Sequence, residues 1–397
     1  MKSLRDEFFL LLSGKAGKYY IAAIAVPVVI VLIFSAIFVN NQVNEGKVFV
    51  VDMDNTAYSR QLIEKMNASQ YIDIQEVVHQ KVNVDEVLYG DKYLAVMYLA
   101  EGLEENHYKA MPNTIGLFLD NTNTMGTANL RTAVQEVVTA ENMAVSIPRV
   151  KAIGLSDDQV TGTLSNISIQ QRMLYNPNSN YANTTVLGFV ILYPTLFFNM
   201  TALPLMARLR MTGQIKGEIM GRSALDVASR VLPYSFFMGV GLFLGLGLLK
   251  LVGGFRFAGN PLEFLIPTFL FTISTGLLAM FASWKAKHPG EAMSKMMLVV
   301  VPGFVFSGAT ISQAILPVWA KMIGNFFPMV WYLRFIRDMG LRGASLGDMI
   351  PEIGGFLLLT GLFLLLVVLR YYQERRNMMK EIALENGEPV AASGHVS

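Results

Sequence analysis

The run "VLGFVILYPTLFFNMTALPLM" (Val186–Met206) carries no charge, and the basic, glycine-punctuated "RLRMTGQIKGEIMGRS" (Arg208–Ser223) follows it almost at once. A helix over the first run would be about 32 Å long, which matches the roughly 30 Å hydrocarbon core of a bilayer. The 397-residue chain is 53% hydrophobic and 16% charged, too apolar for an ordinary soluble domain. We therefore expect a membrane-spanning helix followed by a loop outside the bilayer.

Five more charge-free runs have comparable composition: Ile21–Val39, Val231–Leu249, Phe264–Trp284, Met296–Ala320 and Ile353–Leu369. Together they predict a polytopic α-helical membrane protein with six transmembrane helices. A seventh stretch, Met322–Leu333, is shorter and contains Pro328, which favours a re-entrant or interfacial piece.

Basic residues in the short loops predict the orientation, because Lys and Arg are enriched on the cytoplasmic side. The N-terminal segment (Lys2, Arg5, Lys15 and Lys18) and the loops on its side of the membrane hold 16 basic residues, against six on the other side. Both termini are then cytoplasmic. Four of the six opposing residues, Lys321, Arg334, Arg337 and Arg342, lie in one loop and run against the rule.

The predicted organisation has five parts: a cytoplasmic interfacial helix over 1–19, a first transmembrane helix over 20–39, a periplasmic or external α/β domain over 41–181, transmembrane helices two to six over 182–371, and a cytoplasmic tail over 372–397. The fourth part includes a coupling loop over 207–230 and an external re-entrant segment over 314–345. The inserted 41–181 segment has a net charge of −7, and a large domain is translocated regardless of charge.

Within the inserted segment, strands are predicted at Val48–Val51, Ile72–Ile74, Tyr93–Tyr98 and Thr114–Leu119, with a helix beginning near Thr56 and a helical pattern from Thr127 to about Gln171. The pattern favours a small α/β domain. Asp52 and Asp54 could share a cation. We prefer capping of the Thr56 helix by Asp54 and Asn55, since such side chains accept the free N–H groups of a helix.

The sequence lacks the residues that several kinds of function require. The chain has no cysteine, and its four histidines are far apart without ligand spacing, so no metal site or catalytic residue is expected. The six charge-free runs also lack the ionisable groups that a proton- or sodium-driven transporter requires. No G-x-x-x-x-G-K-[ST] phosphate loop is present. We expect a transport subunit rather than an enzyme, with no cofactor on this chain and ATP and Mg²⁺ on a partner ATPase.

The Arg208–Ser223 stretch fits a short amphipathic helix, with Ile215 and Ile219 on one face and Lys216 and Glu218 beside them. Such a helix could dock onto a partner. Taken alone, it is more often a solvated connector.

Four stretches carry a family resemblance: "VVDMDNTAYSRQLIEKMNAS" (Val50–Ser69), "LYNPNSNYANTTVLGFVI" (Leu174–Ile191), the loop from Arg208 to "RVLPY", and "PGFVFSGATISQAILPVWAKMIGNFFPMVWYLRFIRDMGLRGASL" (Pro302–Leu346). The resemblance that they carry extends over almost all of residues 1–371. The chain resembles the membrane (permease) subunits of type-2 ABC exporters, also called type V, and especially the subgroup with a large external domain between the first and second spans.

The resemblance implies that the loop couples to a cytoplasmic ABC ATPase subunit through Arg210, Gly213, Gln214, Lys216, Gly217 and Glu218. Many relatives have an acidic "ERGT"-like sequence where this chain has "RMTGQ", so the contact residues can differ while the location stays. The resemblance also implies a second permease subunit, identical or different, with the second and fifth spans near the dimer axis.

Polar and aromatic residues of those two spans are candidates for the translocation path: Tyr193, Phe197, Asn199, Thr201, Phe304, Ser307 and Thr310. Bonding of Ser and Thr to their own helix, and ordinary aromatic packing, are the alternatives. Pro302, Gly303 and Gly308 are candidates for a hinge or a static bend.

The sequence thus predicts the permease of an ATP-driven exporter in the bacterial inner membrane, moving an amphipathic or hydrophobic compound outward. A periplasmic adaptor and membrane lipid are further partners considered, and no nucleic acid is expected. The main alternative is a membrane-anchored binding or assembly protein whose external domain recognises a ligand or envelope partner. An enzyme acting on lipids at the outer face is a weaker one.

Overall fold

The computed structural model describes residues 2–14, 18–38, 45–89, 92–109, 111–120, 124–154, 156, 159–160, 174–177 and 180–385. The chain forms two compact units. The helical unit comprises Met1–Asn41 with Met173–Ser397, and the inserted unit comprises Gln42–Arg172. The predicted tail beyond 385 and residues 161–171, the end of the predicted helical pattern, lie outside the described residues.

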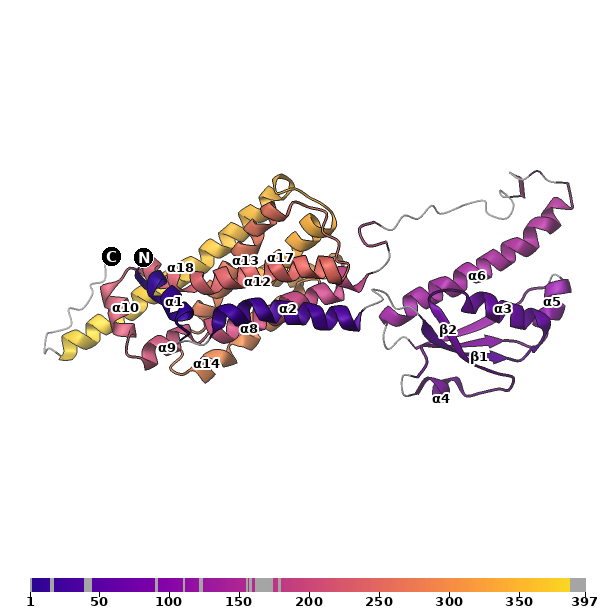
Figure 1. The fold of residues 1–397 in the computed structure, drawn as a ribbon, viewed down its shortest axis with the longest axis horizontal. Helices are drawn as coiled ribbons and strands as arrows, with labels where there is room; N and C mark the ends of the chain where they lie inside the picture. Colours follow the sequence, from indigo (N-terminus) through magenta and orange to yellow (C-terminus); the bar gives the residue numbers. More distant parts are fainter. Residues whose placement is uncertain are drawn as a thin grey trace. The chain divides into compact units, whose positions relative to one another are not determined.

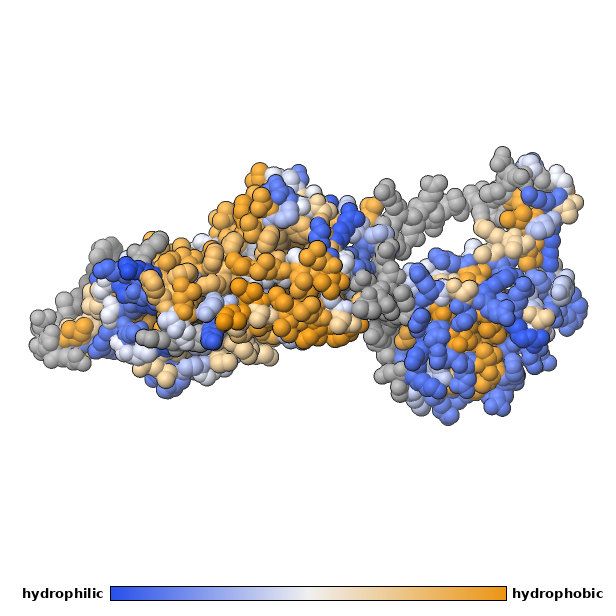
Figure 2. Space-filling view, in the orientation of Figure 1, coloured by the Kyte–Doolittle hydropathy of each residue, from blue (hydrophilic) through white to orange (hydrophobic). Residues whose placement is uncertain are grey.

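Five stretches of helix are long and apolar enough to cross a membrane: Tyr19–Ile37, Thr185–Met211, Ala224–Val252, Pro261–Ala282 and Gly347–Leu384. Their main helices are α2 (Tyr19–Ile37), α8 (Thr185–Ala202), α12 (Leu232–Val252), α13 (Pro261–Ala282) and α18 (Ile350–Glu385). Hydrophobic residues cover the sides of this unit in Figure 2, and hydrophilic residues gather around α1 (Lys2–Leu12) and α10 (Ile215–Gly221). A polytopic helical architecture is therefore confirmed.

The Met296–Ala320 run, predicted as one of the six spans, is not one long helix. This region contains α15 (Met296–Phe306), a bend, and α16 (Val318–Gly324), preceded by α14 (Pro289–Ser294) and followed by α17 (Pro328–Phe335). At 11 residues, α15 is only about 17 Å long, too short to cross a bilayer alone. The helix ends where Gly308 adopts φ +84°, a left-handed conformation that glycine accepts readily.

These short helices nevertheless carry the chain from one end of the helical unit to the other. The carbonyls of Trp284 and Ala286, just after α13, accept hydrogen bonds from Arg210. At the opposite end of α13, Leu346 N donates to Glu263 Oε2 over 2.7 Å. We call the end with Arg210 the loop end and the end with Glu263 the far end. Among the described residues, five helices are long and apolar enough to cross a membrane, and a segmented passage of short helices lies where the fifth of the six transmembrane helices was predicted.

Helices α2 and α12 approach each other closely through glycine. A β-carbon on Gly241 would lie 2.1 Å from the carbonyl oxygen of Ala23, and one on Gly245 would lie 2.9 Å from Cβ of Pro27. The spacing Gly241-x-x-x-Gly245 is the small-residue pattern that lets helix backbones pack tightly in a membrane.

The inserted unit is a four-stranded sheet in the order β2-β1-β3-β4, with β1 (Gly46–Asp52) parallel to β2 (Ile72–Val78) and to β3 (Ala95–Leu99), and β4 (Ile115–Leu119) antiparallel to β3. All four strands overlap the predicted segments. Helices α3 (Ala57–Asn67) and α6 (Thr124–Lys151) cover one face, and α4 (Val84–Leu88) lies against the other, as Figure 1 shows.

The expected capping by Asp54 occurs, but on another helix. Asp54 accepts the backbone N–H groups of Gly102, Leu103 and Glu104 at the start of α5 (Leu103–Lys109). Thr56 is the cap of α3, together with Ser59. The carboxylate crosses to a helix nearly 50 residues away, which no local pattern could reveal.

The remaining short elements are α9 (Leu205–Met211), α11 (Ala224–Ala228), the π-helical turn η5 (Ile336–Leu341) and the 3₁₀ turns η2 (Tyr181–Asn183), η3 (Ser229–Val231), η4 (Gln313–Ile315) and η6 (Gly347–Met349).

Candidate functional site

The predicted coupling loop folds as α9, a tight turn at Gly213, and α10. Gly213 has φ +71°, which ends α9 and allows the chain to reverse. Ile215 and Ile219 lie on the buried face of α10. The hydroxyl of Tyr371 in α18 donates to the carbonyl of Ile219 over 2.9 Å and also to that of Arg222. The loop is therefore an ordered part of the helical unit.

The six predicted contact residues separate into two groups. Gly213, Gln214, Lys216 and Gly217 are exposed. Arg210 and Glu218 are much less accessible to a partner, because Glu218 is 4% exposed and Arg210 is largely covered. The structure therefore places four of the residues on the surface and two within the unit.

Arg210 connects α9 to two other segments. Its guanidinium donates to the carbonyls of Trp284 and Ala286 and forms an ion pair of 3.0 Å with Glu374 in α18. These bonds join the start of the loop to the end of α13 and to α18.

Glu218 is the centre of a second cluster. Arg230 contacts Glu218 through Nη2 and Nε, at 2.7 and 3.0 Å, and Nε of Arg222 lies 3.1 Å away. The hydroxyl of Ser3 in α1 donates to Glu218 over 2.8 Å. Charge-assisted bonds of this kind are short and strong, so they fix the orientation of α10.

Glu7 of α1 continues this cluster. Its carboxylate is fully buried and forms ion pairs with Arg208 and Arg230. It also accepts a hydrogen bond of 2.6 Å from the hydroxyl of Tyr234. Glu7 is not among the predicted site residues, because its segment has the pattern of an interfacial helix. An excess of basic residues in the loop could have pointed to Glu7. The Arg208–Arg230 stretch holds five basic residues and only two acidic ones, Glu218 and Asp226. Basic side chains that are buried there need a carboxylate from another segment.

The predicted path residues differ in how far they are exposed. Asn199 and Ser307 are fully buried, and each donates to a carbonyl of its own helix segment, Thr195 and Phe304 respectively. Thr201 bonds in the same manner to Phe198. The other four residues are exposed (Tyr193, Thr310) or partly buried (Phe197, Phe304).

Helices α8 and α15, which carry these residues, are in direct contact. A β-carbon on Gly188 would lie 2.9 Å from Cβ of Ala309 and 3.5 Å from Phe304. Of the three predicted hinge residues, Gly308 marks the break after α15, while Pro302 and Gly303 lie inside the helix.

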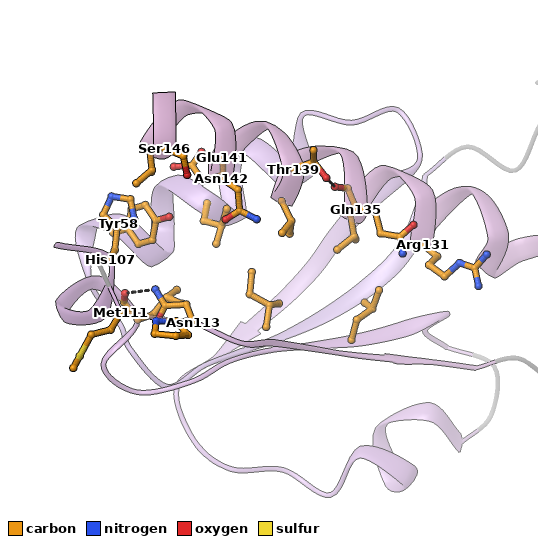
Figure 3. A pocket seen from close by; sticks show the side chains of 18 of the residues that line it. Tyr58, His107, Met111, Asn113, Arg131, Gln135, Thr139, Glu141, Asn142 and Ser146 are labelled. Carbon is orange, nitrogen blue, oxygen red and sulfur yellow. Dashed lines mark hydrogen bonds between the residues drawn. The ribbon is translucent and has the colours of Figure 1, made fainter. Parts of the chain in front are cut away.

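The inserted unit has its own candidate site, a groove of about 1030 Å³ between β4 and α6. Figure 3 shows Tyr58 and His107 toward one end of the groove and Arg131 toward the other. Leu62, Leu103, Ile115, Leu117, Leu119, Val134 and Val138 make it apolar. The groove forms because β4 extends the sheet beyond the area that α3 and α6 cover. The inward-facing side chains of β4, Ile115, Leu117 and Leu119, are therefore only partly buried.

Polar side chains surround the groove. Arg131, Gln135, Asn142 and Arg149 extend from α6, and Glu141 pairs with Lys65 over 2.6 Å. Burial and the neighbouring Glu141 carboxylate raise the pKa of Tyr58 to about 12, so its hydroxyl stays protonated at neutral pH. An apolar floor with a polar rim suits an amphipathic ligand.

Comparison with known proteins identifies one family. The family described as "ABC-2 family transporter protein" matches residues 18–370, which includes the helical unit almost entirely and the whole inserted unit. No curated protein matches the chain.

Proposed function

Because the chain belongs to the ABC-2 family of transporter proteins, we propose that it is the permease subunit of an ATP-driven exporter that moves an amphipathic or hydrophobic compound out across the bacterial inner membrane. Membership makes it a multi-pass transport subunit that is not itself catalytic, and it implies an ATPase partner. In our proposal both termini are cytoplasmic, the loop end faces the cytoplasm, and ATP and Mg²⁺ bind to the partner chain.

The turn between α9 and α10 is the observation that carries this proposal. Gly213, Gln214, Lys216 and Gly217 are exposed there, while Arg210 and Glu218 on either side are held by ion pairs. A surface loop fixed in this way can pass a displacement of the ATPase to α8, α12 and α18 without first deforming itself. A merely solvated connector has no need for buried charge pairs, which cost desolvation.

The remaining parts of the proposal follow from this orientation. The inserted unit lies on the outer side, where the groove between β4 and α6 receives the compound or a periplasmic adaptor binds. A second permease subunit, identical or different, completes the path near α8 and α15. Energy enters through the ATPase because the predicted spans lack ionisable groups.

Two measurements test the exporter. Vesicles containing this chain and its ATPase should accumulate the compound only with ATP, and accumulation without either one would reject the proposal. A detergent pull-down should capture an ATPase with the wild type and lose it with Gly217→Asp. A β-carbon on Gly217 meets nothing within 4 Å, so this variant should fold. Gly290→Asp is a matched control, since Gly290 is equally open but lies in α14.

The groove also favours a second candidate function, a membrane-anchored binding protein whose inserted unit recognises a ligand or an envelope partner. In that case Gly217→Asp should leave activity unchanged, and groove variants alone should abolish it.

A further inference from the structure

Two basic residues that run against the orientation rule share one pocket. Lys321 of α16 and Arg334 of α17 both line a cavity of about 320 Å³ beside the end of α15. Both cationic side chains therefore border the same small space. No Asp or Glu is among the described residues that line it.

A third cation borders the same place. A β-carbon on Gly308 would lie 3.0 Å from Nη1 and Nη2 of Arg337 and 3.1 Å from Cγ of Gln313, which itself lines the pocket. Arg337 is not free there, because its Nη2 donates to the Ser307 carbonyl over 2.9 Å, and the adjacent Asp338 pairs with Arg342. The pocket itself is therefore lined by two cations, Lys321 and Arg334, and by no carboxylate of the described residues.

The pocket has more hydrogen-bond donors than acceptors. Asn325 Oδ1 accepts from Arg334 (3.1 Å), the Ala314 carbonyl from Lys321 (3.3 Å), and the Phe306 carbonyl from Gln313 (3.1 Å). A lysine ammonium has three N–H donors and an arginine guanidinium five. Most of these donors remain after the local acceptors are used, which is the condition for binding an oxyanion.

Arg334 is held in place before any ligand arrives. Its guanidinium stacks on Trp331 at 4.9 Å, and Nε1 of Trp331 donates to the carbonyl of Asn325 over 2.7 Å. A planar guanidinium that is already fixed can form two parallel bonds to a phosphate or carboxylate.

An apolar surface adjoins these cations. Val318, Trp319 and Met322 of α16 are 73%, 62% and 70% exposed, and they flank Lys321 in the sequence. Lys321 is itself exposed, so α16 presents a cation beside large apolar side chains, which matches an anionic headgroup joined to an apolar chain.

We propose that this pocket binds the anionic headgroup of an amphiphile, with a phosphate at Lys321 and Arg334 and the apolar chain along Val318, Trp319 and Met322. The shared ligand chemistry is a phosphate, whether it belongs to a membrane lipid or is free in solution. The site goes beyond the proposed export function, since it needs neither ATP nor the ATPase.

Tryptophan quenching tests this site in the full-length chain. The chain has three tryptophans, so the variant with Trp284→Phe and Trp319→Phe keeps only Trp331, which lies against Arg334. The chain is reconstituted with brominated phosphatidylglycerol or brominated phosphatidylcholine at equal mole fraction. We expect phosphatidylglycerol to quench Trp331 with an association constant on the order of tenfold higher than that of phosphatidylcholine, and Lys321→Gln or Arg334→Gln to remove most of that preference.

Controls separate the site from general surface charge. Lys250→Gln removes a cation near the far end outside the pocket and should leave the preference unchanged, while Lys321→Arg should retain it. Added inorganic phosphate that displaces the quenching lipid shows that the phosphate alone is sufficient, whereas failure to compete shows that the apolar chain is also needed. Equal quenching by the two lipids, or a preference that survives both neutralising variants, overturns the proposal. So does the absence of quenching by either lipid, which would indicate that a second subunit covers α16.

Discussion

Glu7 Oε2 and Arg230 Nη1 lie 2.5 Å apart although 223 residues separate them. The pair is almost fully buried and joins the N-terminal helix α1 to the segment that follows the exposed loop. Arg230 also contacts Glu218 in α10. The loop therefore cannot move independently of α1, α10 and α12, which gives the loop end its rigidity.

Replacing Glu7 with Gln should destabilise the helical unit by about 3 kcal/mol, because Arg208 and the buried Arg230 lose their shared carboxylate. Thermal unfolding in detergent measures the change. Asp6→Asn is the matched control: Asp6 pairs with Arg222 but its side chain is 53% exposed, so the loss should stay below about 1 kcal/mol. Equal effects of the two variants would contradict the role assigned to Glu7.

Tyr371→Phe should loosen α10 without unfolding the chain. The variant loses the hydroxyl that donates to the carbonyls of Ile219 and Arg222, at a cost of about 1–2 kcal/mol. Amide hydrogen exchange in 215–222 should increase. The neighbouring Tyr372 is 57% exposed, so Tyr372→Phe should leave the exchange unchanged, and protection that persists in Tyr371→Phe would show that the hydroxyl does not hold α10.

Gly241→Ala should destabilise the packing of α12 on α2 by about 1–3 kcal/mol, because its β-carbon would lie 2.1 Å from the Ala23 carbonyl oxygen. Gly247 lies in the same helix with nothing within 4 Å of the added carbon. Gly247→Ala should be neutral or slightly stabilising, since alanine has the higher helix propensity. Detergent melting temperatures compare the two, and similar temperatures would refute close packing at Gly241.

A fluorescent probe can report on the groove of the inserted unit. The chain has no cysteine, so Thr139→Cys allows one polarity-sensitive dye to be attached beside the groove. Leu117→Gln should shift the dye emission to the red because it removes part of the apolar floor. Phe118→Gln alters the next residue of β4, which is exposed and does not line the groove, and should have little effect. A shift of equal size in both variants would argue against an apolar groove.

Local patterns predicted much of the fold. The four strands of the inserted unit follow from short apolar runs between turn residues, and five of the six spans follow from charge-free length. Ile215 and Ile219 were correctly assigned to one face of a helix, because helical periodicity depends only on neighbouring residues. The Met296–Ala320 run does not form one long helix, because length does not show that Gly308 takes a left-handed conformation just after the end of α15.

Hydrophobic length and periodicity are properties of adjacent residues, so they are enough to predict a multi-pass helical chain with an inserted α/β segment and a basic loop. Which charged side chains pair inside the molecule depends on contacts between distant segments. Arg210 and Glu218 became structural residues because Glu374, Arg230 and Ser3 are brought to them from distant positions. Burial makes such pairing obligatory, and no local pattern specifies the partner.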